Sequence, residues 1–186
     1  MKTRTILLWV MLLIITDQII KLIINQYFPE SHFSIIPALF EFKPVFNDKH
    51  TYLNSLMNRH FGVNIGLQIH LVCFFLCETT LLILYSFLRS ISSGDRRLLD
   101  LGMSFQIAGV ACSLMGNLIW KNGTLDYIYL NPLFVFDMKD LYLNCFAILL
   151  LVFIHKNRAQ MREVTVKDLI FHIGHQLKTL HLGPKQ

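Results

Sequence analysis

Residues 125–140 read LDYIYLNPLFVFDMKD, and this stretch joins two strongly apolar segments of the chain. It has one aspartate, Asp126, near its beginning and another, Asp140, at its end. Carboxylates this close to the apolar interior of a membrane are energetically costly, and they usually mark a functional site. Two aspartates that meet can share one proton and activate a water molecule, which is the chemistry of aspartic proteases. The stretch therefore predicts a functional pair of carboxylates at one membrane surface.

Each aspartate also has a simpler interpretation when it is taken alone. Asp140 can be an ordinary residue of a first helical turn, stabilised by the helix dipole. Asp126 can be a polar turn residue at the membrane surface. The functional interpretation depends on the two residues lying together.

The composition is that of a membrane protein. Of the 186 residues, 54% are hydrophobic and only 16% are charged, whereas about 25% are charged in an ordinary soluble domain. A membrane-spanning helix needs roughly 20 mainly apolar residues. Four stretches approach this length, at residues 5–24, 66–88, 98–119 and 133–154. We therefore predict an all-α membrane protein with four transmembrane helices.

The first of these stretches contains Asp17 and Lys21, and no small-residue cleavage site follows it. We expect a retained helix and not a cleaved signal peptide. The two residues are four apart, so they can pair on one helix face and lower the cost of burying both charges. Such a pair can be purely structural or can support the carboxylates, and both interpretations stay open.

The basic residues predict the orientation in the membrane. They cluster before the first helix, between the second and third, and after the fourth, and the positive-inside rule makes these regions cytoplasmic. The clusters are Lys2 and Arg4; Arg89, Arg96 and Arg97; and Lys156, Arg158, Arg162 and Lys167. Both termini are then cytoplasmic, and residues 25–65 and 126–140 lie outside. The basic residues behind the net charge of +5 therefore indicate the orientation in the membrane. They do not indicate nucleic-acid binding, and we expect no nucleic-acid partner.

Two segments outside the spans have structure of their own. The stretch FSIIPALFEFKPVF, residues 33–46, alternates weakly and contains two prolines, so it predicts short edge strands in a small extracytoplasmic β segment. Residues 51–62 predict a short helix. The tail at 156–186 has an apolar helical face, which predicts a cytoplasmic amphipathic helix lying on membrane lipids. We thus divide the chain into a membrane domain, residues 1–155, and this tail, residues 156–186.

No metal or cofactor is predicted. Cys73 and Cys77 are one helical turn apart, but no second ligand pair has zinc spacing, so we interpret them as small packing residues. The tail histidines His172, His175 and His181 fit a solvated polar face.

Two polar residues within the predicted helices need partners. Asn117 lies near the outer end of the third helix, where its amide can hydrogen-bond across helices or orient a catalytic carboxylate. Glu78 lies near the middle of the second helix, where a charge is costly. We expect Glu78 to be protonated or paired with Gln106.

Several of these motifs together resemble the lipoprotein signal peptidase (signal peptidase II) family of four-helix bacterial membrane aspartic proteases. TDQIIKLII resembles its Asp-x-x-x-Lys, with Asp17 and Lys21, and the strand stretch IIPALFEFKPVFN places its asparagine on Asn47. GNLIWKNGTLDYI, which contains Asn117, resembles the Gly-Asn-Leu-Ile-Asp-Arg stretch and the first catalytic aspartate, here Asp126. FVFDMKD resembles the Phe-Asn-x-Ala-Asp box, which places the second on Asp140. The resemblance covers most of the first 154 residues.

The chain departs from the family pattern at several positions. The Asp-Arg of the third-helix stretch is Trp120-Lys121 here, so a planar guanidinium is replaced by a point charge. In the box, the asparagine is Asp137 and the alanine is Lys139. Asp137 adds a third carboxylate beside the expected pair, and Lys121 and Lys139 are the residues that can offset its charge. The Gly-Ala-Ala-Phe that follows the family's asparagine is absent. The resemblance is therefore to a divergent member.

The resemblance implies an intramembrane aspartic endopeptidase. Its substrate would be a diacylglyceryl-modified prolipoprotein, cut just before the lipidated cysteine, at the outer face of the bacterial cytoplasmic (inner) membrane. Asp126 and Asp140 would be the catalytic pair, with Asn117, Asn47, Asp17, Lys21, Lys121 and Asp137 in binding or supporting roles. We expect a monomer with no cofactor.

Two alternatives stay open. A non-catalytic protein on the same scaffold would bind lipoprotein precursors or a peptidase inhibitor without cutting, and the replacements at positions 120, 121 and 137 favour it. A small transporter or channel subunit would use Asp17, Lys21 and Glu78 along an ion path, but four helices without an inverted repeat argue against it.

Overall fold

The computed structural model describes residues 1–48, 52–92, 96–120 and 122–182. Within these residues, four helices are long and apolar enough to cross a membrane. They are α1 (Thr3–Tyr27), α3 (Leu67–Ile91), α4 (Arg96–Ile119) and α5 (Met138–Lys156). The prediction of an all-α membrane protein with four spanning helices and a small β segment is confirmed.

Helix α4 is the centre of the helical bundle. In its most apolar window 56% of the residues are buried, against 11–17% in the other three spans. The outer helices expose large apolar side chains, such as Leu8, Phe75 and Leu151, each at least 67% exposed. Apolar side chains exposed in this way are expected of helices surrounded by lipid, because lipid tails are as apolar as the side chains.

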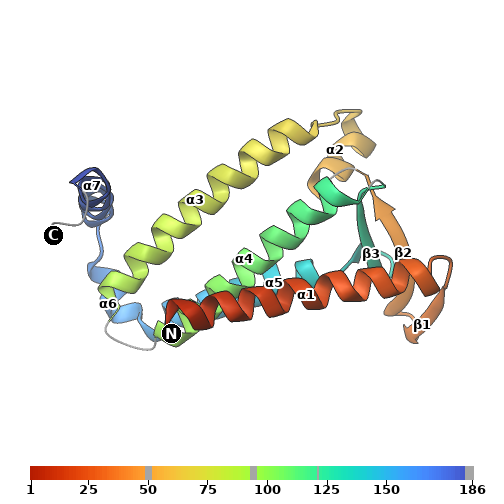
Figure 1. The fold of residues 1–186 in the computed structure, drawn as a ribbon, viewed down its shortest axis with the longest axis horizontal. Coiled ribbons are helices and arrows are strands. Elements are labelled where there is room, and N and C mark those ends of the chain that lie inside the picture. Colours follow the sequence, from red (N-terminus) through yellow and green to blue (C-terminus); the bar gives the residue numbers. More distant parts are fainter. Residues whose placement is uncertain (49–51, 93–95, 121, 183–186) are drawn as a thin grey trace.

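A small antiparallel sheet covers one end of the bundle, opposite to the N-terminus (Figure 1). Its four described strands run in the order β1 (Phe33–Ile36), β2 (Phe40–Asn47), β3 (Thr124–Leu130) and β4 (Phe134–Phe136). The expected strands at 33–46 are present as β1 and β2, but only β1 is an edge strand. β2 pairs with β3 on its other side, and a register shift between Phe42 and Val45 accommodates Pro44 in this inner strand.

The predicted fourth span, at residues 133–154, begins too early. Leu133 lies in a turn and the next three residues form β4, so α5 begins only at Met138. Two local signals explain the difference. The Asn131–Pro132 turn lets the chain fold back so that β4 pairs with β3. Asp137 and Asp140 then form a reciprocal capping box that fixes the helix start.

Three shorter helices complete the described chain: α2 (Tyr52–Phe61), α6 (Arg158–Glu163) and α7 (Val166–Leu182). The helix expected at 51–62 is therefore present. The tail contains two helices, with a break at Val164 and Thr165, where one was expected. Helices α6 and α7 lie at the same end of the bundle as the N-terminus (Figure 1). The placement of the tail as a separate cytoplasmic unit stays a prediction.

Three glycines allow α5 and β3 to approach α4 closely. Gly102, Gly109 and Gly116 are seven residues apart, so they fall along one face of the helix. A Cβ atom at Gly109 would lie 2.9 Å from the Leu143 side chain and 3.2 Å from the Lys139 carbonyl. At Gly116 it would lie 2.6 Å from Thr124 Oγ1. This glycine face brings α5 and β3, which carry the two aspartates, against a common support.

We predict that Gly109→Leu destabilises the fold by about 1–3 kcal/mol, because an added side chain must displace α5. Gly174→Leu on α7 is the matched control, since a Cβ there meets no atom within 4 Å. Thermal unfolding in detergent micelles should show a lower Tm for the first variant only. Equal Tm values for the two variants would contradict the role of this face.

Candidate active site

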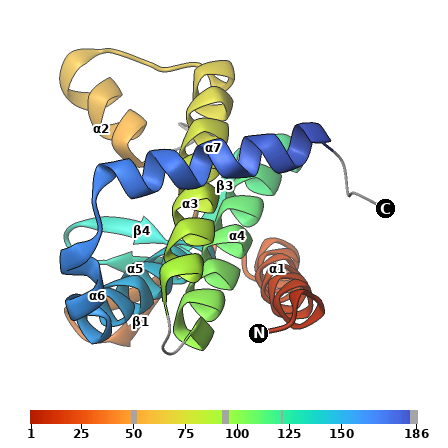
Figure 2. The same cartoon turned by 90° about the vertical axis from the view of Figure 1, so that its left-hand side faces the viewer.

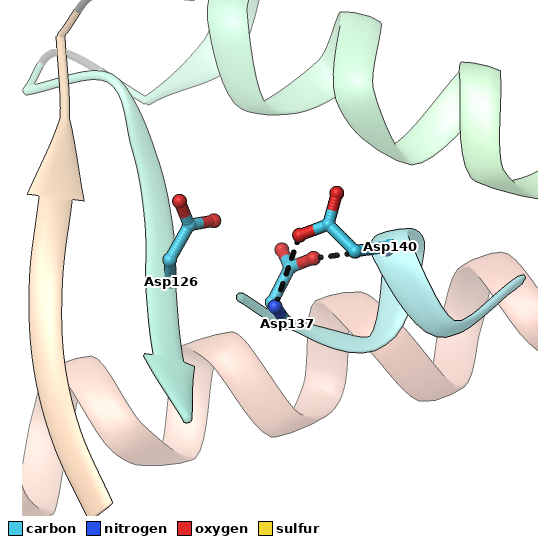
Figure 3. A group of neighbouring side chains, drawn as sticks. All are labelled: Asp126, Asp137 and Asp140. Carbon is cyan, nitrogen blue, oxygen red and sulfur yellow. Dashed lines mark hydrogen bonds between the residues drawn. The ribbon is translucent and has the colours of Figure 1, made fainter. Parts of the chain in front are cut away.

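Asp126 and Asp140 come from different elements and point into one space between β3 and the start of α5 (Figure 3). Leu125 and Tyr127 pack with Ile24 of α1, and strand alternation turns Asp126 to the other face of β3. Asp140 is the third residue of α5. Oxygens of Asp126, Asp137 and Asp140 all lie within 4.8 Å of one another. The structure therefore brings together the two aspartates that the sequence singles out.

Lys139 lies at the centre of this acidic group. Its Nζ is 2.7 Å from Asp126 Oδ1 and 3.4 Å from Asp140 Oδ2. It is also 2.9 Å from Asp137 Oδ1. The side chain is buried, so its charge acts in a medium of lower dielectric than water. The sequence analysis gave Lys139 only a balancing role, whereas the structure places its ammonium in contact with both candidate catalytic carboxylates.

Asp137 connects this group to the first helix. It is fully buried, and its Oδ2 lies 2.7 Å from Lys21 Nζ. Lys21 is in turn 2.9 Å from Asp17 Oδ2. Lys21 therefore links two carboxylates from different elements, and the buried ionic contacts run without interruption from α1 to β3. The Asp17–Lys21 pair expected from the sequence is present as one part of this series of ionic contacts.

The pKa values of the two aspartates outside the spans shift in opposite directions. Burial raises the pKa of Asp126 above its ordinary value, although Lys139 and Asn47 oppose this rise. Burial also disfavours the ionised form of Asp137, but Lys139 and Lys21 together outweigh it, so the pKa of Asp137 is lowered. The lowered pKa of Asp137 favours its ionised form, whereas the raised pKa of Asp126 favours its protonated form.

Asn47 contacts Asp126 across the sheet, and its predicted supporting role stays a prediction. Its Nδ2 donates to Asp126 Oδ2 at 3.4 Å. Asn47 ends β2 opposite Thr124 of β3, two residues from Asp126. The preceding Gly123 has φ +91°, and a Cβ there would lie 2.2 Å from the Asn47 carbonyl oxygen. Glycine at this position therefore lets the end of β2 pass close to the site.

The other predicted polar residues lie in different surroundings. The Asn117 amide donates to the Ser113 carbonyl within its own helix at 2.8 Å. The expected partner of Glu78 is confirmed, because Gln106 Nε2 donates to Glu78 Oε2 at 3.2 Å. Trp120 donates to Gln18 of α1 at 3.4 Å. Lys121 lies outside the described residues.

The three carboxylates have the donor chemistry of a cation site. In this chain the cation among them is the Lys139 ammonium, which is within 3.4 Å of an oxygen of each. The three carboxylates are therefore arranged around a cation of the protein itself. Carboxyl groups this close together can also exchange a proton. Access is on the side of Asp140, whose side chain is 37% exposed against 7% for Asp126.

An apolar hollow of about 240 Å³ adjoins the sheet and the C-terminal half of α1. It is lined by Ile20, Ile23, Ile24, Phe28, Phe33 and Phe42. Ile20 and Ile24 flank the buried Lys21 along the helix. An apolar surface thus lies beside the charged cluster.

Comparisons with known proteins agree with the overall fold. Two solved structures, each described as a bacterial membrane enzyme determined by the in meso method, are similar with a TM-score of 0.60. The one at 1.9 Å resolution is 18% identical and covers 81% of this chain and 92% of its own. The one at 2.3 Å is 19% identical and covers 89% and 96%. At these identities they show a shared fold.

No curated protein matches the sequence. The sequence model of the family described as signal peptidase (SPase) II matches residues 9–156, which include most of α1, all of the other three spanning helices, the sheet and both aspartates. The chain therefore belongs to the signal peptidase II family.

Proposed function

We propose that this protein is an intramembrane aspartic endopeptidase that removes the signal peptide from diacylglyceryl-modified prolipoproteins, cutting before the lipidated cysteine. Membership of the signal peptidase II family supports a peptidase. The observation that carries the finer proposal is the meeting of Asp126 and Asp140, whose oxygens lie within 4.8 Å although they come from different elements.

The charge of the cluster favours a shared proton. Four carboxyl groups and two lysines are in contact, so the fully ionised cluster would have a net charge of minus two in a buried place. One proton held between Asp126 and Asp140 reduces this charge, because two close carboxylates cannot both ionise cheaply. The proton belongs to the pair, and the two carboxyl groups titrate as one unit.

Asp137 and Lys139 preserve this charge balance. In the family box that the sequence resembles, their positions hold asparagine and alanine, both neutral. Here one negative and one positive residue replace them, and the two are in contact at 2.9 Å. The replacements therefore compensate each other, which leaves the excess negative charge on the catalytic pair.

In the proposed reaction, the ionised member of the pair takes a proton from a water molecule, which attacks the scissile carbonyl carbon. The protonated member donates to the carbonyl oxygen. When the tetrahedral intermediate collapses, the C–N bond breaks and the leaving amine takes a proton from the pair. Asn47 and Lys139 hold Asp126 in place, and the water approaches beside the more exposed Asp140.

The substrate would reach this pair from the lipid. Its apolar parts fit the exposed apolar faces of the spans, and the hollow formed by α1, β1 and β2 offers a second apolar surface beside the site. The sheet would lie over the scissile segment, because β3 carries Asp126 and β2 carries Asn47.

One observation favours the non-catalytic alternative. Lys139 Nζ lies 2.7 Å from Asp126 Oδ1 and also reaches Asp140. An ammonium that kept both carboxylates ionised would leave no acid to donate a proton. A protein in this state would bind a lipoprotein precursor without cutting it.

We predict that Asp126→Asn and Asp140→Asn each lower cleavage of a diacylglyceryl-modified precursor by at least about a hundredfold, because each removes a proton-transfer group. Cleavage is measured with purified protein by the change in precursor mobility on a gel. Asp168→Asn, a change of the same kind on the exposed face of α7, should cleave like the unchanged protein. Precursor binding without cleavage by the unchanged protein would favour the non-catalytic alternative.

We further predict that Lys139→Met shifts the pH–activity profile upward by about one unit or more. Lys139 lowers the pKa of Asp126, so its removal makes the pair hold protons to higher pH. Both limbs of the profile should move, because the active form has one proton on the pair.

The double variant Asp137→Asn/Lys139→Ala restores two neutral residues, so its profile should return towards that of the unchanged protein. If the single and double variants show the same profile, the proposed charge compensation is wrong.

A further inference from the structure

A second site lies far from the aspartates, where α7 crosses the C-terminal part of α3 (Figures 1 and 2). The two helices meet through His172, whose Nε2 lies 3.1 Å from Ser86 Oγ and whose ring packs against Phe87. Two hollows adjoin this crossing, of about 400 Å³ and about 310 Å³. They share the lining residues Ser86, His172 and Gln176, so they adjoin each other at this crossing, and together they form the α3–α7 groove. Its size is in the range of small-molecule sites.

The two parts of this α3–α7 groove differ in chemistry. The first is the more polar of the two and is lined by Ser86, Arg89, Ser90, Arg96 and His172, among others. The second is mainly apolar and is lined by Leu82, Ile83 and Ile173, together with Thr79 and the shared residues.

The polar part lies towards the end of α3 and the apolar part towards its middle. Thr79 and Ser90 are separated by roughly 16 Å along the helix axis. The groove therefore changes from polar to apolar in the direction of the bilayer centre, as a phospholipid does.

The two arginines of the polar part are held in place. Arg89 Nε is 3.2 Å from Asp100 Oδ1, and its Nη2 donates to the Met1 carbonyl at 3.2 Å, yet 40% of its side chain is exposed. Asp100 also pairs with the terminal ammonium of Met1 and accepts from the Tyr85 hydroxyl. Asp100 is therefore shared by three partners, so it does not fully neutralise the charge of Arg89.

Arg96 donates from Nε to the Ser92 carbonyl at 2.9 Å, and the residue is exposed. Both guanidinium groups are thus fixed by their own contacts and remain accessible. Planar guanidinium groups held in this way are preferred partners of phosphate oxygens.

The exposed face of α7 indicates that the groove opens to lipid. Val166, Ile170 and Phe171 are 63–77% exposed, although such large apolar side chains are unfavourable in water. A helix with this face, lying across a spanning helix, is typical of the boundary between headgroups and acyl chains. A molecule in the groove would therefore meet lipid on its open side.

We propose that the α3–α7 groove binds one anionic glycerophospholipid. Arg89 and Arg96 contact its phosphate, with Ser86 and Ser90 as further polar partners, and one acyl chain lies along Leu82, Ile83 and Ile173. The lipid fixes α7 against the membrane surface. This site does not depend on the proposed peptidase function, because it shares no residue with the aspartate cluster.

The test is native mass spectrometry of the full-length protein in detergent, titrated with dioleoylphosphatidylglycerol. The unchanged protein should bind one lipid saturably. Arg96→Gln should weaken binding by about tenfold, the loss expected for a hydrogen bond to a charged group. Arg97→Gln removes the same charge one residue away from the groove lining, so it should change binding by less than about twofold. Unchanged Tm values exclude a folding defect.

The second variant, Ile83→Trp, fills the apolar part of the groove. It should weaken binding of the dioleoyl lipid but not of the dihexanoyl form, whose short chains do not reach this part. Retained dioleoyl binding would overturn the acyl-chain placement.

Three further results would overturn the proposal. Equal losses for Arg96→Gln and Arg97→Gln would indicate non-specific attraction. Displacement of the lipid by inorganic phosphate would indicate a simple anion site. Equally tight binding of uncharged dioleoylglycerol would indicate an apolar groove that does not recognise phosphate.

Discussion

The buried chain of ionic contacts is the constraint on which the rest of the structure depends. It runs from Asp17 through Lys21, Asp137 and Lys139 to Asp126. Burying an ion costs several kcal/mol, and removing one partner leaves its neighbour uncompensated. Each charge in this chain is therefore stable only where its neighbours are correctly placed. These ionic contacts thus fix the first helix, the start of the last spanning helix and the sheet relative to one another.

Backbone features place the same residues independently of their charges. The capping box of Asp137 and Asp140 fixes where α5 begins, and the glycine face of α4 allows α5 and β3 to come close. The pairing of β2 with β3 positions Asn47 beside Asp126. The acidic pair is therefore held by a helix cap, a helix–helix contact and a strand ladder, each with its own sequence signal.

The sequence analysis predicted the four spans because apolar runs of this length are typical of membrane-spanning helices. It predicted the β segment from the weak alternation and the two prolines of residues 33–46. It also identified Asp126, Asp140 and Asn47, which the structure brings together. It missed β3, most of which it placed in an outer connecting segment, and β4, which it included in the fourth span because FVF is too short and apolar to be separated from a helix by periodicity alone. The capping box of Asp137 and Asp140 was the signal that could have placed the helix start.

The position of Lys139 was the main feature that sequence reasoning underestimated. Its distance from Asp137 and Asp140 along the chain suggested a local charge balance. Its contact with Asp126 depends on the β3–β4 turn, which returns the chain to the start of α5. A contact made through such a turn cannot be obtained from residue spacing. The presence of a lysine and an aspartate at two neutral positions of the family box was the only hint.

The sheet has a consequence for biosynthesis. β2 leaves the ribosome before α3 and α4, whereas β3 and α5 follow them. Asn47 is therefore synthesised before Asp126 and Asp140, and two spanning helices are made between them. A nascent chain that has inserted only its first three spans has none of the acidic pair in position, so the meeting of the two aspartates is possible only after the start of the last span has been synthesised.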